Sequence, residues 1–286
     1  MYSQNISQDN RGAVVIVVDC SLSMKSITKF NHTLLPKYRV AKLITNHIIE
    51  ELVARSARPT YMRDYFDIAV IGYSGEDSFS LHEELGDGFV SVVRFAECRP
   101  QPEAEMINQL TREGNIVEVP ITIHPWIETS AAGASPMYDA LMRAKMLIGT
   151  WCKHRDNTEN FPPIIFHITD GACSDAIPAD LMELSREIQK IGTSDGNALI
   201  ITIHLSTYGD EEEKCGIYPR EGDFASADQD RMLMFQMSSI VPETLEPYVF
   251  RTRNAQYLGP YRAVALDFSP CSMLSIINIG SKTVSL

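Results

Sequence analysis

Apolar residues along this chain fall into two patterns that alternate from one end to the other. Short β-branched runs such as Val14 to Val18 predict strands that are buried on both faces of a parallel sheet. Further strands are predicted within residues 66–74, 162–170, 197–207 and 261–269. Segments with apolar residues at helical spacing lie between them, predicting helices at 36–57, 135–151, 176–192 (closed by Gly192) and 228–240, and a short one in the tail. This alternation predicts an α/β fold with a doubly wound, mostly parallel central sheet flanked by helices.

Two long stretches interrupt the alternation. Residues 75–129 are expected to hold an edge strand or hairpin and one short helix, and residues 208–228 form a polar loop. Loops of this length are usually functional or disordered. Because sheet strands are predicted on both sides of each stretch, neither is expected to be an interdomain linker. We therefore expect a polar N-terminal tail at residues 1–10 and a single domain at residues 11–286.

Composition and charge narrow the class of protein. Hydrophobic residues make up 44% and charged residues 22% of the 286 positions, as in ordinary globular proteins. The net charge of −12 argues against binding to nucleic acid or to an anionic membrane, since both need basic patches. The N-terminus lacks a signal-peptide pattern, and no apolar stretch approaches the ~20 residues of a membrane helix. We expect a cytoplasmic protein.

The six cysteines are widely spaced, with no pair at metal-ligand spacing. This pattern predicts reduced, buried thiols. An exported protein with an even number of cysteines remains an alternative.

Candidate chemistry gathers where the predicted strands end. Asp19 ends the first strand and is followed by Ser21 and Ser23, whereas Asp170 ends the strand "IIFHITD". Ser135 lies between them in sequence, in the small-residue loop of "SAAGASPMYDAL". Because ligands bind at the carboxyl ends of such strands, these side chains are expected at one edge of the sheet. All five are oxygen donors, which suits Mg²⁺ or Mn²⁺, with Ca²⁺ as a further candidate, and does not suit zinc.

Each part of this set also has a plain structural interpretation. Asp19 and its serines could simply begin a loop, Ser135 before Pro136 could cap a helix, and Asp170 could form a turn. Thr129 and Ser130 are alternatives to Ser135. His167 and His204 are interpreted as core histidines, because they do not cluster with other ligands. The combination at three strand ends favours the metal site.

At these residues the sequence resembles the von Willebrand factor type A family. The family's metal-ion-dependent adhesion site has a DxSxS motif, a later threonine loop and an aspartate after the central strand. This chain matches it with "DCSLS" (Asp19, Ser21, Ser23) and "ITDG" (Asp170), and it departs from it by having Ser135 in "GASPMYDAL" where the family mostly has threonine. Serine lacks the β-branch that stiffens the side chain, so this ligand is expected to be less rigid. The resemblance is greatest to compact bacterial cytoplasmic members, the TerY-like group linked to tellurium resistance.

The resemblance implies a metal-dependent protein-binding module and not an enzyme. In the family, an acidic residue of a partner protein completes the shell of the ion, and cytoplasmic members work beside kinases, phosphatases or MoxR-type ATPases. Two alternatives are a Mg²⁺-dependent phosphohydrolase and a structural interaction protein that never holds metal. Aspartyl-phosphate phosphatases usually place a second aspartate two positions after the first, where this chain has Ser21. A nucleophile without an acid–base partner is a poor catalyst.

Overall fold

The computed structural model describes residues 2–30, 32–111, 114–210, 216–220, 228–247, 249 and 259–266. A seven-stranded sheet forms its centre, in the order β13-β12-β9-β1-β4-β5, with β6 also paired to β4. The parallel strands are β1 (Gly12–Asp19), β4 (Phe66–Ser74), β9 (Ile164–Thr169), β12 (Leu199–His204) and β13 (Val264–Leu266). Only β5 (Asp77–Ser80) and β6 (Val90–Ser91) run antiparallel within this sheet. The predicted α/β fold with a mostly parallel sheet is confirmed.

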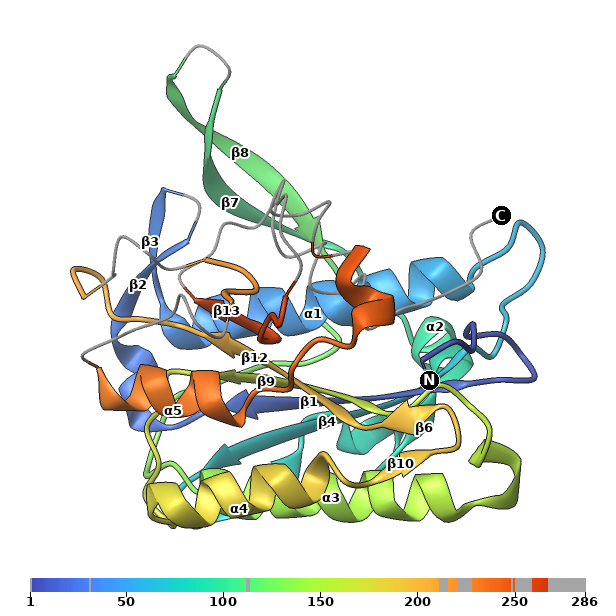
Figure 1. The fold of residues 1–286 in the computed structure, drawn as a ribbon. Coiled ribbons are helices and arrows are strands. Elements are labelled where there is room, and N and C mark those ends of the chain that lie inside the picture. Colours follow the sequence, from blue (N-terminus) through green and yellow to red (C-terminus); the bar gives the residue numbers. More distant parts are fainter. Residues whose placement is uncertain are drawn as a thin grey trace.

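Helices cover both faces of the sheet (Figure 1). One face packs against α1 (Lys37–Ser56) and α2 (Val92–Glu97), and the other packs against α3 (Met137–Lys153), α4 (Pro178–Ile188) and α5 (Gln229–Met237). The side chains of β1 alternate between these two layers. Ile16 belongs to the core under α1, whereas Val15 and Val17 belong to the core under α3 and α4. Burial on both faces explains the continuous β-branched run of this strand.

Three hairpins and four short 3₁₀ helices complete the described elements. The hairpins are β2 (Ile27–Phe30) with β3 (Thr33–Pro36), β7 (Glu103–Leu110) with β8 (Ile116–Ile123), and β10 (Gly192–Thr193) with β11 (Gly196–Asn197). The 3₁₀ helices are η1 (Leu22–Lys25), η2 (Glu83–Leu85), η3 (Arg155–Asn157) and η4 (Glu243–Leu245). The β7–β8 hairpin projects from the body of the molecule (Figure 1). Residues 75–129 thus hold the predicted edge strand, hairpin and short helix.

One prediction from the sequence is wrong, and two others fall largely or wholly on residues that the structure does not describe. The helix expected to close at Gly192 ends at Ile188, and Gly192 pairs in β10 instead. Residues of the polar N-terminal segment contact the domain: Ile6 is buried in the main core, and Ser3 N donates to Asp195 Oδ1 at 2.8 Å. Most of the 208–228 loop, at 211–215 and 221–227, and the tail helix lie outside the described residues.

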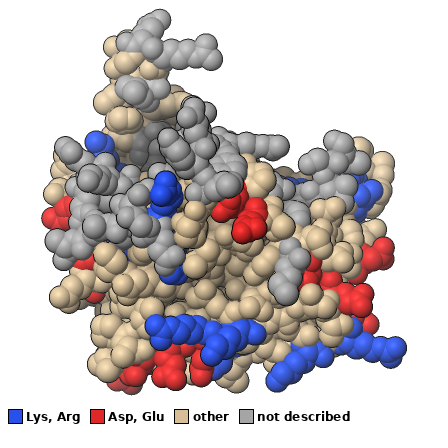
Figure 2. Space-filling view, in the orientation of Figure 1, with Lys and Arg blue, Asp and Glu red and all other residues tan. Residues whose placement is uncertain are grey.

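The described residues include four of the cysteines. Cys20 and Cys152 are buried, Cys173 is half-buried and Cys98 is exposed, and these four carry free thiols. The expectation of buried thiols therefore fails at Cys98. No helix in the described ranges combines the length and apolar character needed to cross a membrane. On the face seen in Figure 2, basic and acidic side chains lie next to one another along the edge where α3 and α4 run.

Candidate metal centre

The strand order creates a crevice between β1 and β9. From β1 the chain passes through α1 to β4 on one side of β1, and it later passes through α3 to β9 on the other side. At such a switch point the two connections diverge, which opens a crevice at the carboxyl ends of the neighbouring strands. Asp19 is the last residue of β1, and Asp170 directly follows β9. The two predicted carboxylates therefore lie at the carboxyl ends of the two strands that flank this switch point.

Asp19 is completely buried at the base of the site. Its Oδ1 accepts a hydrogen bond from the Ser21 backbone N–H at 2.9 Å. Its Oδ2 accepts from the Tyr73 hydroxyl at 3.2 Å and from the Thr169 hydroxyl at 3.1 Å. Burial raises the pKa of Asp19 to about 6, and the nearby charge of Asp170 acts in the same direction. Three hydrogen bonds thus hold the Asp19 carboxylate in place, and the charge of Asp170 adds to its own negative charge.

Ser21 and Ser23 present their hydroxyls side by side. Both flank Leu22, at the start of η1, and their Oγ atoms are 2.9 Å apart. Adjacent ligands of an octahedral Mg²⁺, at about 2.1 Å from the ion, would be about 3 Å apart. The two hydroxyls are thus hydrogen-bonded to each other, at a separation that adjacent ligands of a hard cation would also have.

Ser135 comes to Asp19 from the loop before α3. Its Oγ donates to the Ala172 carbonyl at 2.7 Å and lies 3.4 Å from Asp19 Oδ2. The hydroxyl oxygen of Ser135 therefore lies beside the Asp19 carboxylate. The interpretation of Ser135 as a helix cap is wrong, since Pro136 occupies the cap position and no side-chain cap bond forms.

Backbone hydrogen bonds tie the Ser135 loop to the Ser21 loop. Ala132 N donates to Cys20 O at 2.9 Å, and Leu22 N donates to Gly133 O at 3.0 Å. Thr129, the alternative ligand, instead donates its hydroxyl to the carbonyl of Tyr38 on α1 at 2.8 Å. The structure therefore brings Ser135 to Asp19 and turns Thr129 towards α1.

Asp170 carries a partner that the sequence did not reveal. Lys37, the first residue of α1, places its Nζ 3.1 Å from Asp170 Oδ2, and both side chains are only 5% exposed. The other carboxylate oxygen, Oδ1, accepts from Ala172 N at 3.3 Å. Lys37 lies outside every recognisable motif, and only the fold brings it to the crevice. Its ammonium group neutralises one of the two carboxylates.

The residues present fit a hard divalent cation. The set is all oxygen, two of its members are carboxylates, and the hydroxyl spacing matches a compact coordination shell. The described residues contain no group of three His, Cys, Asp or Glu side chains that could hold a metal. A site here would therefore depend on its serine hydroxyls, as the sequence predicts.

Sequence reasoning missed the residues that support the set from behind. Thr169 accepts from Gly171 N at 2.9 Å while it donates to Asp19, so it fixes the turn after β9. The Tyr73 hydroxyl bridges Asp19 and His167: it donates to Asp19 Oδ2 and lies 3.1 Å from His167 Nε2. His204 Nε2 lies 3.1 Å from the Asp170 carbonyl oxygen. Both histidines are buried, as expected; His167 lies within β9, and His204 is the last residue of β12.

Comparisons with known proteins give structural likenesses at low identity. No protein-family model and no curated protein matches the sequence. A von Willebrand factor type A structure from Catenulispora acidiphila is 15% identical, covers 68% of this chain and 33% of its own, and has a TM-score of 0.38. Proximal thread matrix protein 1 from the mussel byssus, with a zinc-occupied MIDAS motif, is 14% identical, covers 70% of this chain and 37% of its own, and scores 0.38.

An aerotolerance-related membrane protein from Bacteroides fragilis covers more of both chains. It is 12% identical, covers 79% of this chain and 85% of its own, and has a TM-score of 0.35. This chain thus spans about a third of the length of the first two structures. All three TM-scores lie below 0.5, so the α/β fold is established by the sheet topology of this chain itself.

Proposed function

We propose that this chain is a divalent-metal-dependent protein-binding module. Ser21, Ser23 and Ser135 would hold Mg²⁺ or Mn²⁺, with Asp19 and Asp170 direct or water-bridged. The observation that carries this proposal is that Ser21, Ser23 and Ser135 lie beside Asp19 at the switch point of the sheet, with Asp170 at the end of the neighbouring strand. The match of "DCSLS" and "ITDG" to the von Willebrand factor type A motif supports it.

The chemistry favours an acidic partner. A bound ion would supply a Lewis-acidic position that accepts one more oxygen ligand. The three hydroxyls bring no charge, and Lys37 offsets Asp170, so the residues leave a dication incompletely neutralised. A Glu or Asp side chain of another protein is a hard anionic ligand suited to that position. The net charge of −12 opposes such a partner at long range, but screening beyond ~8 Å leaves direct coordination dominant.

Apolar side chains are exposed on the loop after β1 and on the hairpin that follows it. Leu22 is 53% exposed between the two serines, and Leu34 on β3 is 52% exposed. Tyr208, also exposed, donates its backbone N–H to the carbonyl of Ile27 on β2 at 2.7 Å, which joins the β12 loop to this hairpin. We propose that these side chains and the loops at 75–129 and 208–228 select the partner.

The cellular setting is part of the proposal and rests on the family resemblance. We propose a cytoplasmic protein that works in a multiprotein or stress-response assembly similar to those of tellurium resistance. Kinases, phosphatases or MoxR-type ATPases are the neighbours that this resemblance implies.

Metal-dependent stabilisation tests the site. Mn²⁺ at about 100 times its Kd should add about 2.7 kcal/mol to the stability of the wild type. Asp19→Ala should abolish this gain, and Ser23→Ala, which removes only a half-buried hydroxyl, should reduce it. Ser26→Ala in the same loop is the matched control. Thermal melts with Mn²⁺ or EDTA give the readout, and equal Mn²⁺ responses in wild type and Asp19→Ala would refute the site.

Partner capture tests the binding role. A partner should be captured with Mg²⁺ or Mn²⁺, be lost with EDTA and return when metal is restored. Changing one Glu or Asp of that partner to Ala should also release it. A complex that survives EDTA unchanged would place the contact elsewhere and favour a metal-free interaction protein.

One observation favours a second candidate, a Mg²⁺-dependent phosphohydrolase. Lys37 beside Asp170 supplies an ammonium group that could bind a phosphate. Against it, Asp19 is fully buried and accepts three hydrogen bonds, which hinders its action as a nucleophile. Turnover of p-nitrophenyl phosphate with Mg²⁺, lost in Asp19→Ala, would support this candidate over the first.

A further inference from the structure

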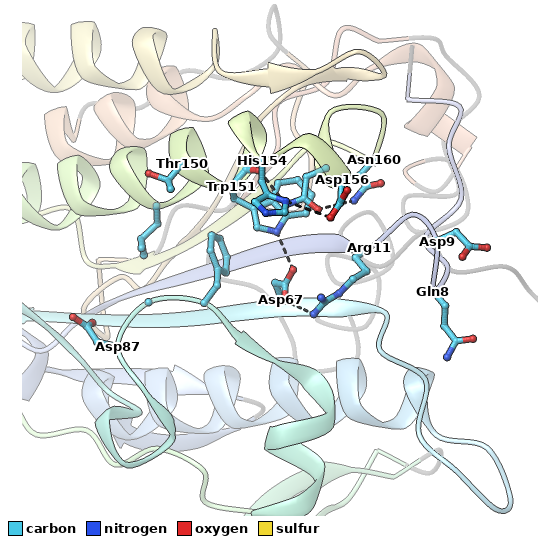
Figure 3. Close-up of a pocket in the computed structure, with 14 residues that line it drawn as sticks. Gln8, Asp9, Arg11, Asp67, Asp87, Thr150, Trp151, His154, Asp156 and Asn160 are labelled. Carbon is cyan, nitrogen blue, oxygen red and sulfur yellow. Dashed lines mark hydrogen bonds and ion pairs between the residues drawn. The ribbon is translucent and has the colours of Figure 1, made fainter.

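A cavity of about 600 Å³ lies at the start of β1, whereas the candidate metal centre lies at the end of this strand. Figure 3 shows the residues that line the cavity. Arg11 precedes β1 there, and Asp67 comes from the start of β4. Phe89, Trp151 on α3 and Asn160 after η3 form further parts of the wall. The volume is in the range of small-molecule sites. This cavity shares no residue with the proposed metal centre.

The strongest donors of the cavity are already paired. Arg11 Nη2 donates to Asp64 Oδ1 at 3.1 Å and also to Asp67 Oδ1, so its charge is balanced within the protein. Trp151 Nε1 donates to Asp67 Oδ2 at 2.9 Å, as the dashed line in Figure 3 shows. Asp67 is therefore a structural carboxylate that fixes one wall.

The acceptors of the cavity are in excess. Asp9, Asp87 and Asp156 line it in addition to Asp67, so with neutral His154 its ionisable side chains carry a formal charge of −3. Asp87 Oδ1 accepts a hydrogen bond from Arg143 Nη2 at 2.6 Å. The side chain of Asp156 is 83% exposed, and its Oδ2 lies 3.7 Å from His154 Nδ1. Such a lining attracts a cation and repels an anion.

A second observation is independent of this charge. Asn160 lines the cavity and is only 2% exposed, and its Oδ1 has no hydrogen-bond partner. Its amide nitrogen is already engaged, since it donates to Asn157 Oδ1 at 3.2 Å. A buried acceptor without a donor costs about 1–3 kcal/mol. Because Oδ1 is itself buried, a ligand N–H group would relieve that cost by drawing the Asn160 side chain towards the cavity.

The aromatic side chains indicate which donor-rich cation fits. Phe89 and Trp151 lie with ring centroids 6.5 Å apart at 52°. A flat guanidinium group stacks on aromatic faces and presents five N–H donors to carboxylates in a fixed fork. An ammonium group is more strongly hydrated and stacks less well.

We propose that this cavity binds an alkyl guanidinium group, either of a free small molecule or of an arginine side chain. Asp156 and Asp9 attract the cation at the rim, Phe89 and Trp151 pack against its plane, and Asn160 accepts an N–H. The site acts independently of the metal centre.

Calorimetric titration of the whole chain in EDTA tests this site. The probes are agmatine as a free guanidinium, N-acetylarginine amide as a peptide-borne one, and N-acetylcitrulline amide as the neutral analogue of the second. We expect saturable binding of the guanidinium probes and none of the citrulline analogue. Binding of agmatine alone would assign a free small molecule, and tighter binding of the arginine amide would assign a peptide side chain.

Variants locate the binding. The double variant Asp9→Asn with Asp156→Asn, both at the surface, should weaken binding at least about fivefold, whereas Asp180→Asn, at an exposed position of α4, should leave it unchanged. Asn160→Ala should weaken it further. Equal binding of the citrulline analogue, or no saturable binding of either guanidinium at millimolar concentration, would overturn the proposal.

Discussion

Lys37 places an ammonium group 3.1 Å from a carboxylate oxygen of Asp170, with both side chains almost fully buried. A divalent ion that draws on the charge of Asp170 must compete with this lysine. The lysine also compensates the buried carboxylate when no ion is present, because an unpaired buried charge is strongly destabilising. At the scale of single residues, Lys37 thus opposes metal binding while it stabilises the metal-free fold.

Replacing Lys37 by methionine should separate these two effects. Lys37→Met should lower the melting temperature in EDTA, bind Mn²⁺ about tenfold more tightly, and show a larger Mn²⁺-induced stabilisation than the wild type. Calorimetric titration and thermal melts measure the two quantities. Lys42→Met is the control, since Lys42 lies on the same helix and pairs with the largely exposed Glu128. An unchanged Kd in a variant that still binds Mn²⁺ would contradict the competition.

His167 makes stability depend on pH. Burial lowers its pKa to about 3, with His204 acting in the same direction, and its ring faces Tyr73. Between pH ~6.5 and ~3 the unfolded chain binds a proton that the folded chain refuses, so the unfolding free energy falls as the pH falls through this window. Above pH ~6.5 the full contribution is present. Burial raises the pKa of Asp19 to about 6, so the folded chain takes up this proton before the unfolded chain does. The contribution of Asp19 to the unfolding free energy therefore rises as the pH falls below about 6.

His167→Gln should remove the histidine contribution while the effect of Asp19 remains. Urea unfolding in EDTA at several pH values should therefore give a shallower loss of stability towards acid pH in the variant. The difference between the two curves isolates His167, because all other groups are common to both proteins. Parallel curves would show that His167 is already charged, or equally neutral, in both states.

At the scale of elements, the loop before α3 depends on one close backbone approach. Gly133 has φ of +68°, and a Cβ there would lie 2.8 Å from both the N and Cα atoms of Gly75. The same loop bonds to Cys20 and Leu22 and positions Ser135. A side chain at Gly133 would push this loop away from the turn after β4, where Gly75 lies, and so disturb the segment that positions Ser135.

Gly133→Ala should therefore lower stability by about 1–3 kcal/mol and weaken Mn²⁺ binding. Gly114→Ala is the matched control, because Gly114 has φ of +86° with no atom within 4 Å of the added Cβ. This control measures only the strain of placing alanine at a positive φ, because Gly114 lies in the turn between β7 and β8 and outside the Ser135 loop. Urea midpoints and Mn²⁺ titration measure both effects, and equal losses in the two variants would exclude a role for the close approach.

The buried parallel strands and their helices could be predicted because their apolar periodicity records burial directly. Val40, Ile44 and Ile48 on α1 are all fully buried, as their spacing predicted. The hairpins β2–β3 and β10–β11 were missed since they are short and half-exposed. Ile6 was missed for a similar reason: one apolar residue in a polar segment has no period, although it packs into the main core.

The candidate ligands were predictable because each one follows a strong local signal, a strand end or a helix start. Lys37 was not, since its role depends on the distance between α1 and β9, which no local pattern encodes. The support from Tyr73 has the same origin. Its hydroxyl reaches Asp19 because β4 pairs in register with β1, with Asp19 opposite Tyr73.

At the scale of the whole molecule, β1 connects the two proposed sites. Arg11 precedes the strand at the cavity, and Asp19 ends it at the candidate metal centre. Eight steps of about 3.3 Å separate these residues by about 26 Å. Each residue of β1 is buried, and the strand is paired on both sides, with β4 and β9.

β1 is therefore a fixed spacer through the middle of the protein. Two ligands held at its ends cannot touch, and sites so far apart without shared partners contribute additively to stability. A protein docked over the ion and a guanidinium held at the far edge could occupy one molecule together. The strand would hold the two ligands at a constant separation.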